Sequence, residues 1–170
     1  MKNIYLIGFM GTGKTTVGKI IAEKLKKSFV EMDSLIEEHE GKEINEIFEN
    51  KGEPYFRNLE KELLLKLSGE SDLVISCGGG AVCNEENISL VKRTGKVFCL
   101  SATAATIYER TKKYSHRPLL KVASPLKQIE ELLLRRFPYY RQADYIVDTE
   151  GVTPDEVAEK ILDIIKRKTD

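Results

Sequence analysis

Residues 8–15 have the types and the spacing that suit the binding of a polyphosphate. The segment reads Gly-Phe-Met-Gly-Thr-Gly-Lys-Thr and matches the phosphate-binding loop (P-loop) pattern G-x-x-x-x-G-K-[ST] at every fixed position. Its glycines let the backbone turn tightly and aim N–H groups inward, where a Cβ would obstruct an anion. Lys14 can reach the β- and γ-phosphates, and the Thr15 hydroxyl can bind Mg²⁺. The segment therefore predicts a nucleotide site with a divalent cation.

The segments on either side predict the geometry that such a loop needs. Residues 3–7 form a short apolar run that is typical of a buried strand. Residues 16–25 place their apolar side chains on one face, as an amphipathic helix does. Strand, glycine loop and helix together put a helix N-terminus under a phosphate. The alternative, an ordinary glycine-rich βα turn, is disfavoured because a strand and a helix flank the match.

Two charged side chains outside the loop are candidates for chemistry, each with a plain alternative. Asp33 follows the second predicted strand, where its carboxylate can orient an acceptor hydroxyl or take its proton. An aspartate at this position can also simply cap a helix. Arg57 can point inward and fork onto a carboxylate or phosphate. Arg57 and Glu60 are i, i+3 neighbours, however, and the residues alone favour a solvated surface ion pair.

Two further segments carry weaker signals. Gly78-Gly79-Gly80 directly follows the predicted strand 73–77, and three glycines in a row have an entropy cost without packing anything. We interpret them as a close approach of backbone to a ligand rather than a wide turn. Arg117 lies in a basic segment, where it can stabilise the transferring phosphoryl group or belong to an ordinary surface loop.

Composition limits the class of protein. The chain has 170 residues, which suits one domain, and its 27 basic residues balance 27 acidic ones. Nothing in the net charge favours binding to nucleic acid or to an anionic membrane. The apolar N-terminal run is too short for a signal peptide or a membrane span. The three cysteines lack a CxxC pair, which favours buried thiols in a reducing compartment. We expect a cytoplasmic enzyme without nucleic-acid or membrane partners.

Strand-like and helix-like segments alternate along the chain. The predicted strands are 3–7, 29–32, 73–77, 96–100 and 144–148. The predicted helices are 15–27, 34–39, 43–50, 53–68, 85–92, 103–113, 125–137 and 154–168. This alternation predicts an α/β fold with a parallel sheet covered by helices on both faces. Such sheets form their sites at the carboxyl ends of the strands, so the P-loop, Asp33 and the triple glycine are expected to converge.

Two regions interrupt this alternation. Residues 34–68 contain two or three predicted helices where a simple crossover needs one, which indicates an inserted substrate-binding region. Residues 112–124 are rich in basic and turn-forming residues and are interpreted as a mobile lid. No repeat or linker divides the chain, so we expect one domain over residues 1–170.

Taken in order, these motifs resemble the shikimate kinase family, small P-loop kinases of the nucleoside-monophosphate-kinase structural class. The resemblance extends from about residue 2 to residue 165. The segments that carry it are 8–18, Met32-Asp33, Ile47-Phe48, Gly52-Glu53, Phe56-Arg57 with Glu60, 76–82, 117–120 and Tyr140-Arg141 before Ala143-Asp144. The P-loop alone indicates only a nucleotide, whereas the ordered combination is specific.

The resemblance implies a fold, a reaction and a set of site residues. The implied fold is a three-layer α/β/α P-loop NTPase fold with a central five-stranded parallel sheet, a substrate-binding region at 33–60 and a mobile lid at 112–124. The implied reaction transfers the γ-phosphoryl group of ATP to the 3-hydroxyl of shikimate, in chorismate and aromatic amino-acid biosynthesis. Mg²⁺ is the implied cofactor, ATP and shikimate are the implied partners, and a monomer is expected.

The resemblance assigns roles to residues as follows. The implied catalytic residues are Asp33, Lys14 and Arg117. The implied shikimate-binding residues are Asp33, Arg57, Gly78, Gly79, Gly80 and Arg141, with Glu60 supporting Arg57. The implied ATP-binding residues are Gly11, Thr12, Gly13, Lys14, Thr15, Thr16, Arg110, Arg117 and Pro154, of which Arg110 and Pro154 match positions that flank the adenine. Thr15 is the implied ligand of Mg²⁺.

The chain departs from the family pattern in two places. The family commonly has Asp-x-Asp after the second strand, whereas this chain has Glu31-Met32-Asp33, which leaves the metal geometry less certain. Some relatives carry a basic residue near positions 151–152 that contacts adenine, and this chain has Gly151-Val152 there. Neither departure removes a group that phosphoryl transfer needs.

Two other functions remain open at this stage. A different small-molecule kinase on the same scaffold, such as a gluconate kinase or a nucleotide kinase, would also use Asp33 and arginines for an anionic acceptor. The triple glycine and Phe56-Arg57 argue against it. A nucleotide-dependent binding module would hydrolyse ATP slowly and have no small-molecule acceptor. The balanced charge and the lack of a partner-binding tail make this reading less favoured.

Overall fold

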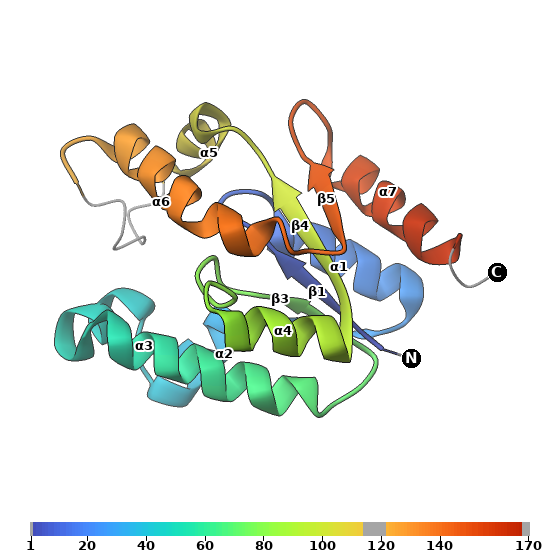
Figure 1. Ribbon diagram of the computed structural model, residues 1–170, viewed down its shortest axis with the longest axis horizontal. Helices are drawn as coiled ribbons and strands as arrows, with labels where there is room; N and C mark the ends of the chain where they lie inside the picture. The colour runs from blue at the N-terminus through green and yellow to red at the C-terminus, as the bar shows by residue number, and fades with distance from the viewer. Residues whose placement is uncertain (1, 114–121, 168–170) are drawn as a thin grey trace.

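A parallel sheet forms the centre of the computed structural model, which describes residues 2–113 and 122–167 (Figure 1). Its strands are β1 (Asn3–Ile7), β2 (Ser28–Glu31), β3 (Leu73–Ser76), β4 (Gly95–Ser101) and β5 (Tyr145–Asp148). They lie in the order β2-β3-β1-β4-β5, and every neighbouring pair is parallel. The α/β fold class with a five-stranded parallel sheet is confirmed.

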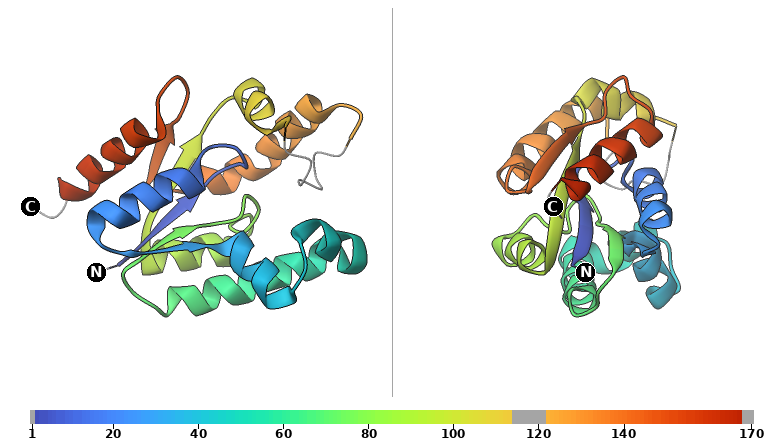
Figure 2. Two further views of the ribbon diagram at one scale, coloured as in Figure 1. Left: turned by 180° about the vertical axis from the view of Figure 1, so that it is seen from behind. Right: turned by 90° about the vertical axis from the view of Figure 1, so that its right-hand side faces the viewer.

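Helices cover both faces of the sheet. They are α1 (Lys14–Leu25), α2 (Met32–Glu40), α3 (Ile44–Ser68), α4 (Glu85–Thr94), α5 (Ala104–Thr111), α6 (Pro125–Tyr140) and α7 (Pro154–Lys166). Along β1, Leu6 packs with the apolar faces of α1 and α7, whereas Tyr5 and Ile7 pack with α3, α4 and α6. Successive strand residues point to opposite faces, so a strand buried on both sides must be apolar throughout. Figure 2 shows the resulting three layers.

The two helices predicted at 43–50 and 53–68 form the single element α3, which is broken at Gly52. The φ of Gly52 is 80° and its ψ is 170°, so the backbone leaves the helix there and resumes it afterwards. The first part of α3 packs against α2 around Ile36, Ile47 and Phe56, which form a small separate core. These helices thus extend beyond the main sheet, as the teal and light-blue segments of Figure 1 show.

The predicted element boundaries differ from the structure in two places that matter for the site. Met32 was predicted to end the second strand but begins α2, so Asp33 lies in the first turn of that helix. The helix predicted over 125–137 continues to Tyr140, past Pro138. A proline removes one backbone hydrogen bond from a helix. Pro138 lies only two residues before the end of α6, so the loss affects only the last turns of the helix. The extension keeps Arg136 and Tyr140 on one rigid element.

Two compositional expectations can be compared with the structure. Cys77, Cys83 and Cys99 are all free thiols, and Cys77 and Cys99 are buried. Among the helices that the structure describes, none combines the length and the apolar character that a membrane crossing requires.

Candidate active site

The P-loop joins the end of β1 to the start of α1. Gly13 forms the N-terminal cap of α1 with a φ of 94°, a left-handed conformation that a side chain would strain. The Nζ atom of Lys14 donates hydrogen bonds to the carbonyl oxygens of Gly8 and Phe9, both at 2.9 Å. The Thr12 hydroxyl donates to the Phe9 carbonyl at 2.8 Å. The loop is therefore held in shape by its own side chains, with the N-terminus of α1 beneath it.

Thr15 and Glu31 supply oxygen atoms at the start of α1 and the end of β2. The Thr15 hydroxyl donates a hydrogen bond to Oε2 of Glu31. Burial raises the pKa of Glu31, and the hydrogen bond from Thr15 opposes that rise. A hydroxyl and a carboxylate side by side are the hard oxygen donors that Mg²⁺ accepts alongside nucleotide phosphates. The residues present therefore fit the implied cation, with Glu31 in the place of the more common aspartate.

Arg110 connects the P-loop with the segment after β5. Its Nη1 atom donates to the Gly11 carbonyl at 3.2 Å and to the Thr149 hydroxyl at 3.0 Å, and its Nη2 atom donates to the Thr149 carbonyl at 2.9 Å. Pro154, five residues after Thr149, is exposed and begins α7. Arg110 thus contacts the P-loop next to the chain segment that leads to Pro154, and its implied contact with the adenine stays a prediction.

The triple glycine lies where the acceptor side of the site forms, because β3 lies between β2 and β1 in the sheet. A Cβ atom on Gly78 would lie 2.5 Å from Oε1 of Glu60 and 2.8 Å from Oδ1 of Asp33. A Cβ atom on Gly80 would lie 2.4 Å from Nη1 of Arg57. Real Cβ atoms do not approach other atoms so closely, so a side chain at either position would displace these charged groups. Charged side chains, Asp33 and Arg57 among them, thus lie close against this turn, whereas the predicted approach of its backbone to a ligand stays a prediction.

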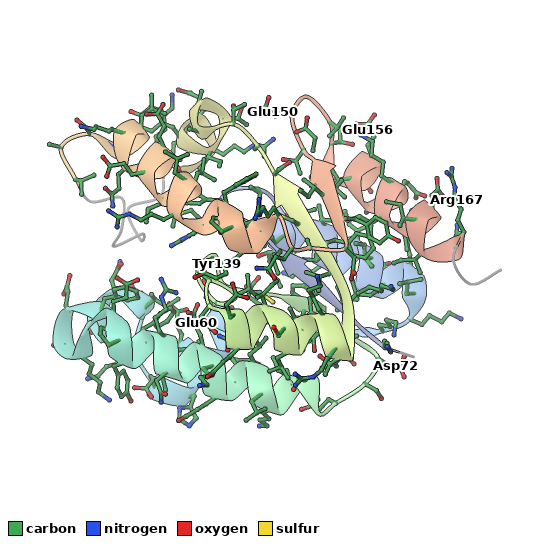
Figure 3. The ribbon with its side chains drawn as sticks, viewed as in Figure 1. Glu60, Asp72, Tyr139, Glu150, Glu156 and Arg167 are labelled. Carbon is green, nitrogen blue, oxygen red and sulfur yellow. The ribbon has the colours of Figure 1, made fainter. Side chains whose placement is uncertain are left out.

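Arg57 and Glu60 do not form the solvated surface pair that the residues alone favoured. Nη1 of Arg57 donates to Oε2 of Glu60 at 2.6 Å, and the Glu60 side chain is only 2% exposed. On its outer side, Nε and Nη2 of Arg57 donate to Oε1 of the half-exposed Glu53, at 3.2 and 3.0 Å. Glu60 recurs with the buried Phe56, Leu64 and Leu67 at intervals of three and four residues on one face of α3, so the helical period offered a signal of its burial. Figure 3 marks Glu60 on α3.

Burial raises the pKa of Glu60 to about 7, against the opposing effect of the Arg57 cation. The negative charge of Asp33 raises it further, and the positive charge of Arg136 lowers it. Removal from water destabilises the charged form of a carboxyl group, and one strong ion pair only partly offsets that effect. The Glu60 carboxyl group therefore changes its charge near neutral pH, next to Asp33 and Arg57.

The raised pKa of Glu60 makes a prediction for stability. The folded state binds this proton more tightly than the unfolded state, whose carboxyl group titrates near 4.5. The protonated Glu60 therefore contributes its full stabilisation to the free energy of unfolding below about pH 4.5. This contribution, about 3 kcal/mol in total, is lost as the pH rises through about 7. Glu60→Gln should remove this loss, so its free energy of unfolding relative to the wild type should rise between pH 5 and pH 8. Urea unfolding at four pH values measures it.

Glu53→Gln is the matched control for that measurement. Glu53 contacts the same guanidinium but is half exposed, so its replacement should shift the free energy of unfolding by a similar small amount at each pH. The free energies of unfolding of Glu60→Gln and the wild type could instead differ by a constant amount from pH 5 to pH 8. That result would contradict the titration of Glu60 in this pH range.

Arg136 is part of this cluster, although none of the sequence motifs includes it. Its side chain lies over the ring of Phe9, with 5.0 Å between the guanidinium carbon and the ring centre. Its Nη1 atom lies 3.0 Å from the position that a Cβ on Gly79 would take. That atom is buried and has no hydrogen-bond partner among the described residues. A buried donor without a partner is costly, and here it faces the glycine turn.

The structure does not bring Arg141 to the cluster. Arg141 caps the end of α6 and is exposed. The helical period offers the signal that would have favoured Arg136 instead. Ile129, Leu132, Arg136 and Tyr140 recur at intervals of three and four residues on one buried face of α6. An arginine within such an apolar stripe is a candidate ligand-binding cation.

One predicted residue cannot be placed. Arg117 lies outside the described residues, as do residues 114–121 as a whole, so the predicted lid at 112–124 is described only at its two ends.

The sheet order, the P-loop at the N-terminus of α1 and the charged glycine turn beside it define a P-loop kinase. Comparisons with known proteins identify the family. A model of the shikimate kinase family matches residues 10–166, and the chain belongs to that family.

Relatives and solved structures agree with this assignment over the whole chain. The shikimate kinase of Thermodesulfovibrio yellowstonii is 51% identical, with 95% of this chain and 94% of that protein covered. The structure of shikimate kinase from Acinetobacter baumannii in complex with shikimate has a TM-score of 0.95 at 38% identity, covering 99% of this chain and 94% of that one. A gluconokinase from Sinorhizobium meliloti has a TM-score of 0.66 at 16% identity, covering 98% of this chain and 92% of that one. At this low identity, the match shows a shared fold alone.

Proposed function

We propose that the protein transfers the γ-phosphoryl group of ATP to the 3-hydroxyl of shikimate, giving shikimate 3-phosphate and ADP in chorismate and aromatic amino-acid biosynthesis. Membership of the shikimate kinase family supports this proposal. The observation that carries it is the cluster at the glycine turn, where Asp33, Arg57 and Arg136 lie within reach of one turn beside the P-loop. One carboxylate and two guanidinium groups suit a hydroxylated, anionic acceptor.

Asp33 is proposed to bind the acceptor hydroxyl. Its Oδ1 atom lies 2.8 Å from the position that a Cβ on Gly78 would take. This position is at the carboxyl ends of the strands, where the P-loop also lies. A carboxylate there can align the hydroxyl for in-line attack and accept its proton as the new P–O bond forms. Phosphoryl transfer depends mainly on positioning and charge neutralisation, so either role of Asp33 favours the reaction.

Arg57 and Arg136 are proposed to hold the acceptor carboxylate, with Arg136 in the place that the resemblance gave to Arg141. The two guanidinium groups approach adjacent glycines, since Nη1 of Arg57 and Nη1 of Arg136 lie 2.4 and 3.0 Å from the Cβ positions of Gly80 and Gly79. The unpartnered Nη1 of Arg136 would gain a charge-assisted hydrogen bond from an anion at this turn. Backbone groups of Gly79 and Gly80 are proposed to contact the acceptor ring hydroxyls.

On the nucleotide side, Lys14 and Arg117 are proposed to neutralise charge on the transferring phosphoryl group, and Arg110 and Pro154 to flank the adenine. Thr15 is proposed as the protein ligand of Mg²⁺, with Glu31 beside it. These two residues would hold the cation, and bound Mg²⁺ would offset the negative charge of the phosphates. A cytoplasmic location and a monomeric state remain predictions.

The proposal is tested by ADP release with Mg-ATP, measured with shikimate, gluconate or a nucleoside monophosphate as acceptor. We expect a large rise with shikimate alone. A rise with another acceptor instead would retain the kinase and reject the substrate. ATP binding without ADP release in any mixture would support a nucleotide-dependent binding module.

Gly80→Ala makes a selective prediction. The added methyl group would overlap the Arg57 guanidinium, whose Nη1 and Cζ atoms lie 2.4 and 2.5 Å from the Cβ position. The overlapping atoms end a side chain, so Arg57 can move aside, but this movement weakens its ion pair with the buried Glu60. We expect the KM for shikimate to rise about tenfold or more and the Tm to fall, with the KM for ATP nearly unchanged.

Gly69→Ala serves as the control for this variant, because a Cβ on Gly69 would meet only the Lys66 carbonyl at 3.4 Å, far from the site. Steady-state kinetics and thermal unfolding of both variants make the comparison. Equal losses for shikimate and ATP in Gly80→Ala would point to misfolding and contradict the selective effect.

A further inference from the structure

The last turn of α6 is tied to the middle of the glycine turn. The hydroxyl of Tyr140 donates a hydrogen bond to the carbonyl oxygen of Gly79 at 2.5 Å. The Tyr140 residue is only 6% exposed, and a buried phenol hydroxyl needs such a partner. Burial raises the pKa of Tyr140, so the hydroxyl stays protonated and remains a donor near neutral pH. The contact joins two segments that are 61 residues apart in the chain.

The same helix carries Arg136 one turn earlier. Residues four apart lie on one face of a helix, so the Arg136 and Tyr140 side chains leave α6 in the same direction. Both of them approach Gly79: Tyr140 through its hydroxyl, and Arg136 through an Nη1 atom 3.0 Å from the Cβ position of Gly79. The position of Arg136 above the turn therefore depends on where the last turn of α6 lies.

The other contact of the Arg136 guanidinium does not define its position as sharply. The guanidinium lies over the Phe9 ring at 5.0 Å, and a cation above a ring face can slide at little cost. A hydrogen bond between a rigid tyrosine and a backbone carbonyl constrains both distance and direction. The Cys83 thiol donates to the same carbonyl at 3.7 Å, a weaker contact from the other side of the turn.

We propose that Tyr140 is a positioning residue, which fixes α6 to the Gly79 carbonyl and so sets the position of Arg136 for binding the acceptor carboxylate. This inference rests on the proposed function, because it assigns an anionic acceptor to Arg136. Tyr140 acts through Arg136 and the glycine turn and does not itself touch the acceptor. Its hydroxyl thus affects the acceptor side of the site and leaves the nucleotide side unchanged.

Tyr140→Phe tests the inference, because it removes the hydroxyl and keeps the ring. We expect the KM for shikimate to rise about fivefold, the effect of one net hydrogen bond, with kcat and the KM for ATP within twofold of the wild type. Tyr139→Phe is the matched control, since this neighbouring tyrosine also packs against the core but has no hydrogen bond to Gly79 (Figure 3). We expect Tyr139→Phe to leave the KM for shikimate unchanged.

A double-mutant cycle with Arg136→Lys separates positioning from a structural role. If Tyr140 acts through Arg136, the double variant Tyr140→Phe/Arg136→Lys should raise the KM for shikimate by clearly less than the product of the two single effects. Effects that multiply independently, or a fall in Tm without a change in KM, would overturn the inference. Should the wild type lack shikimate-dependent activity, the proposed function itself fails, and the two failures are thereby distinguished.

Discussion

Asp33→Asn is expected to lower kcat by about 10²- to 10⁴-fold while the affinity for ATP stays unchanged. Asparagine has the size of aspartate but cannot accept a proton, and it binds a hydroxyl more weakly than a carboxylate does. Asp33 lies in the first turn of α2, at the Gly78 end of the site and on the acceptor side of the P-loop. Its replacement therefore affects the acceptor hydroxyl and leaves the phosphate-binding loop intact.

The measurement is kcat at saturating shikimate and Mg-ATP, with the ATP dissociation constant taken separately by calorimetry. Glu38→Gln is the control, because Glu38 is an exposed carboxylate on the same helix and should leave kcat within twofold. A near-normal kcat for Asp33→Asn would remove Asp33 from its proposed role. A loss of only about tenfold would indicate a group that orients the hydroxyl without taking its proton.

Most of the fold follows from local pattern. The apolar runs at β1, β3 and β4 are buried on both faces of the sheet. Such runs are typical of the central strands of a parallel sheet that helices cover on both sides. The strand and the helix that flank the P-loop were predicted from their own apolar patterns. The sheet order is not contained in any local segment. It brings β2, β3 and β1 side by side, and with them the ends that carry the site.

The acceptor side was only partly predictable, for a physical reason. The triple glycine gave a signal because three residues without side chains are unfavourable unless something lies against them. The charged groups that fill the space, Glu60 and Arg136, come from two helices distant in the chain. Near Arg57, the spacing showed a helical ion pair, and the burial of its partner Glu60 was visible only as a glutamate within an apolar helical stripe. Burial of Arg136 was visible only as an arginine within an apolar helical stripe.

Arg136→Met is expected to raise the KM for shikimate by about 30- to 700-fold, corresponding to about 2–4 kcal/mol for the loss of a buried charge-assisted contact. Methionine keeps an apolar stem of similar length over Phe9 and removes only the guanidinium. The KM for ATP should stay within twofold, because the described residues proposed to bind the nucleotide belong to the P-loop, α1, α5 and α7 and not to α6. Steady-state kinetics with each substrate varied in turn provide the measurement.

Arg141→Met is the matched control, since it makes the same change five residues later at an exposed position on the same helix end. We expect its KM for shikimate to remain near the wild-type value. A larger effect from Arg141→Met than from Arg136→Met would restore Arg141 as the carboxylate ligand. No effect from either variant would mean that Arg57 holds the carboxylate alone.

The stability of Arg136→Met should change in the opposite direction to its function. Nη1 of Arg136 is buried and has no hydrogen-bond partner within residues 2–113 and 122–167, and the desolvation of such a cation opposes folding. Its removal should therefore leave the free energy of unfolding unchanged or raise it, as measured by urea unfolding without ligand. Added shikimate should then stabilise the wild type and not the variant, because ligand binding raises stability only where the ligand still binds. A residue that lowers folding stability and raises acceptor affinity is one retained for binding, and this pair of measurements separates that role from core packing.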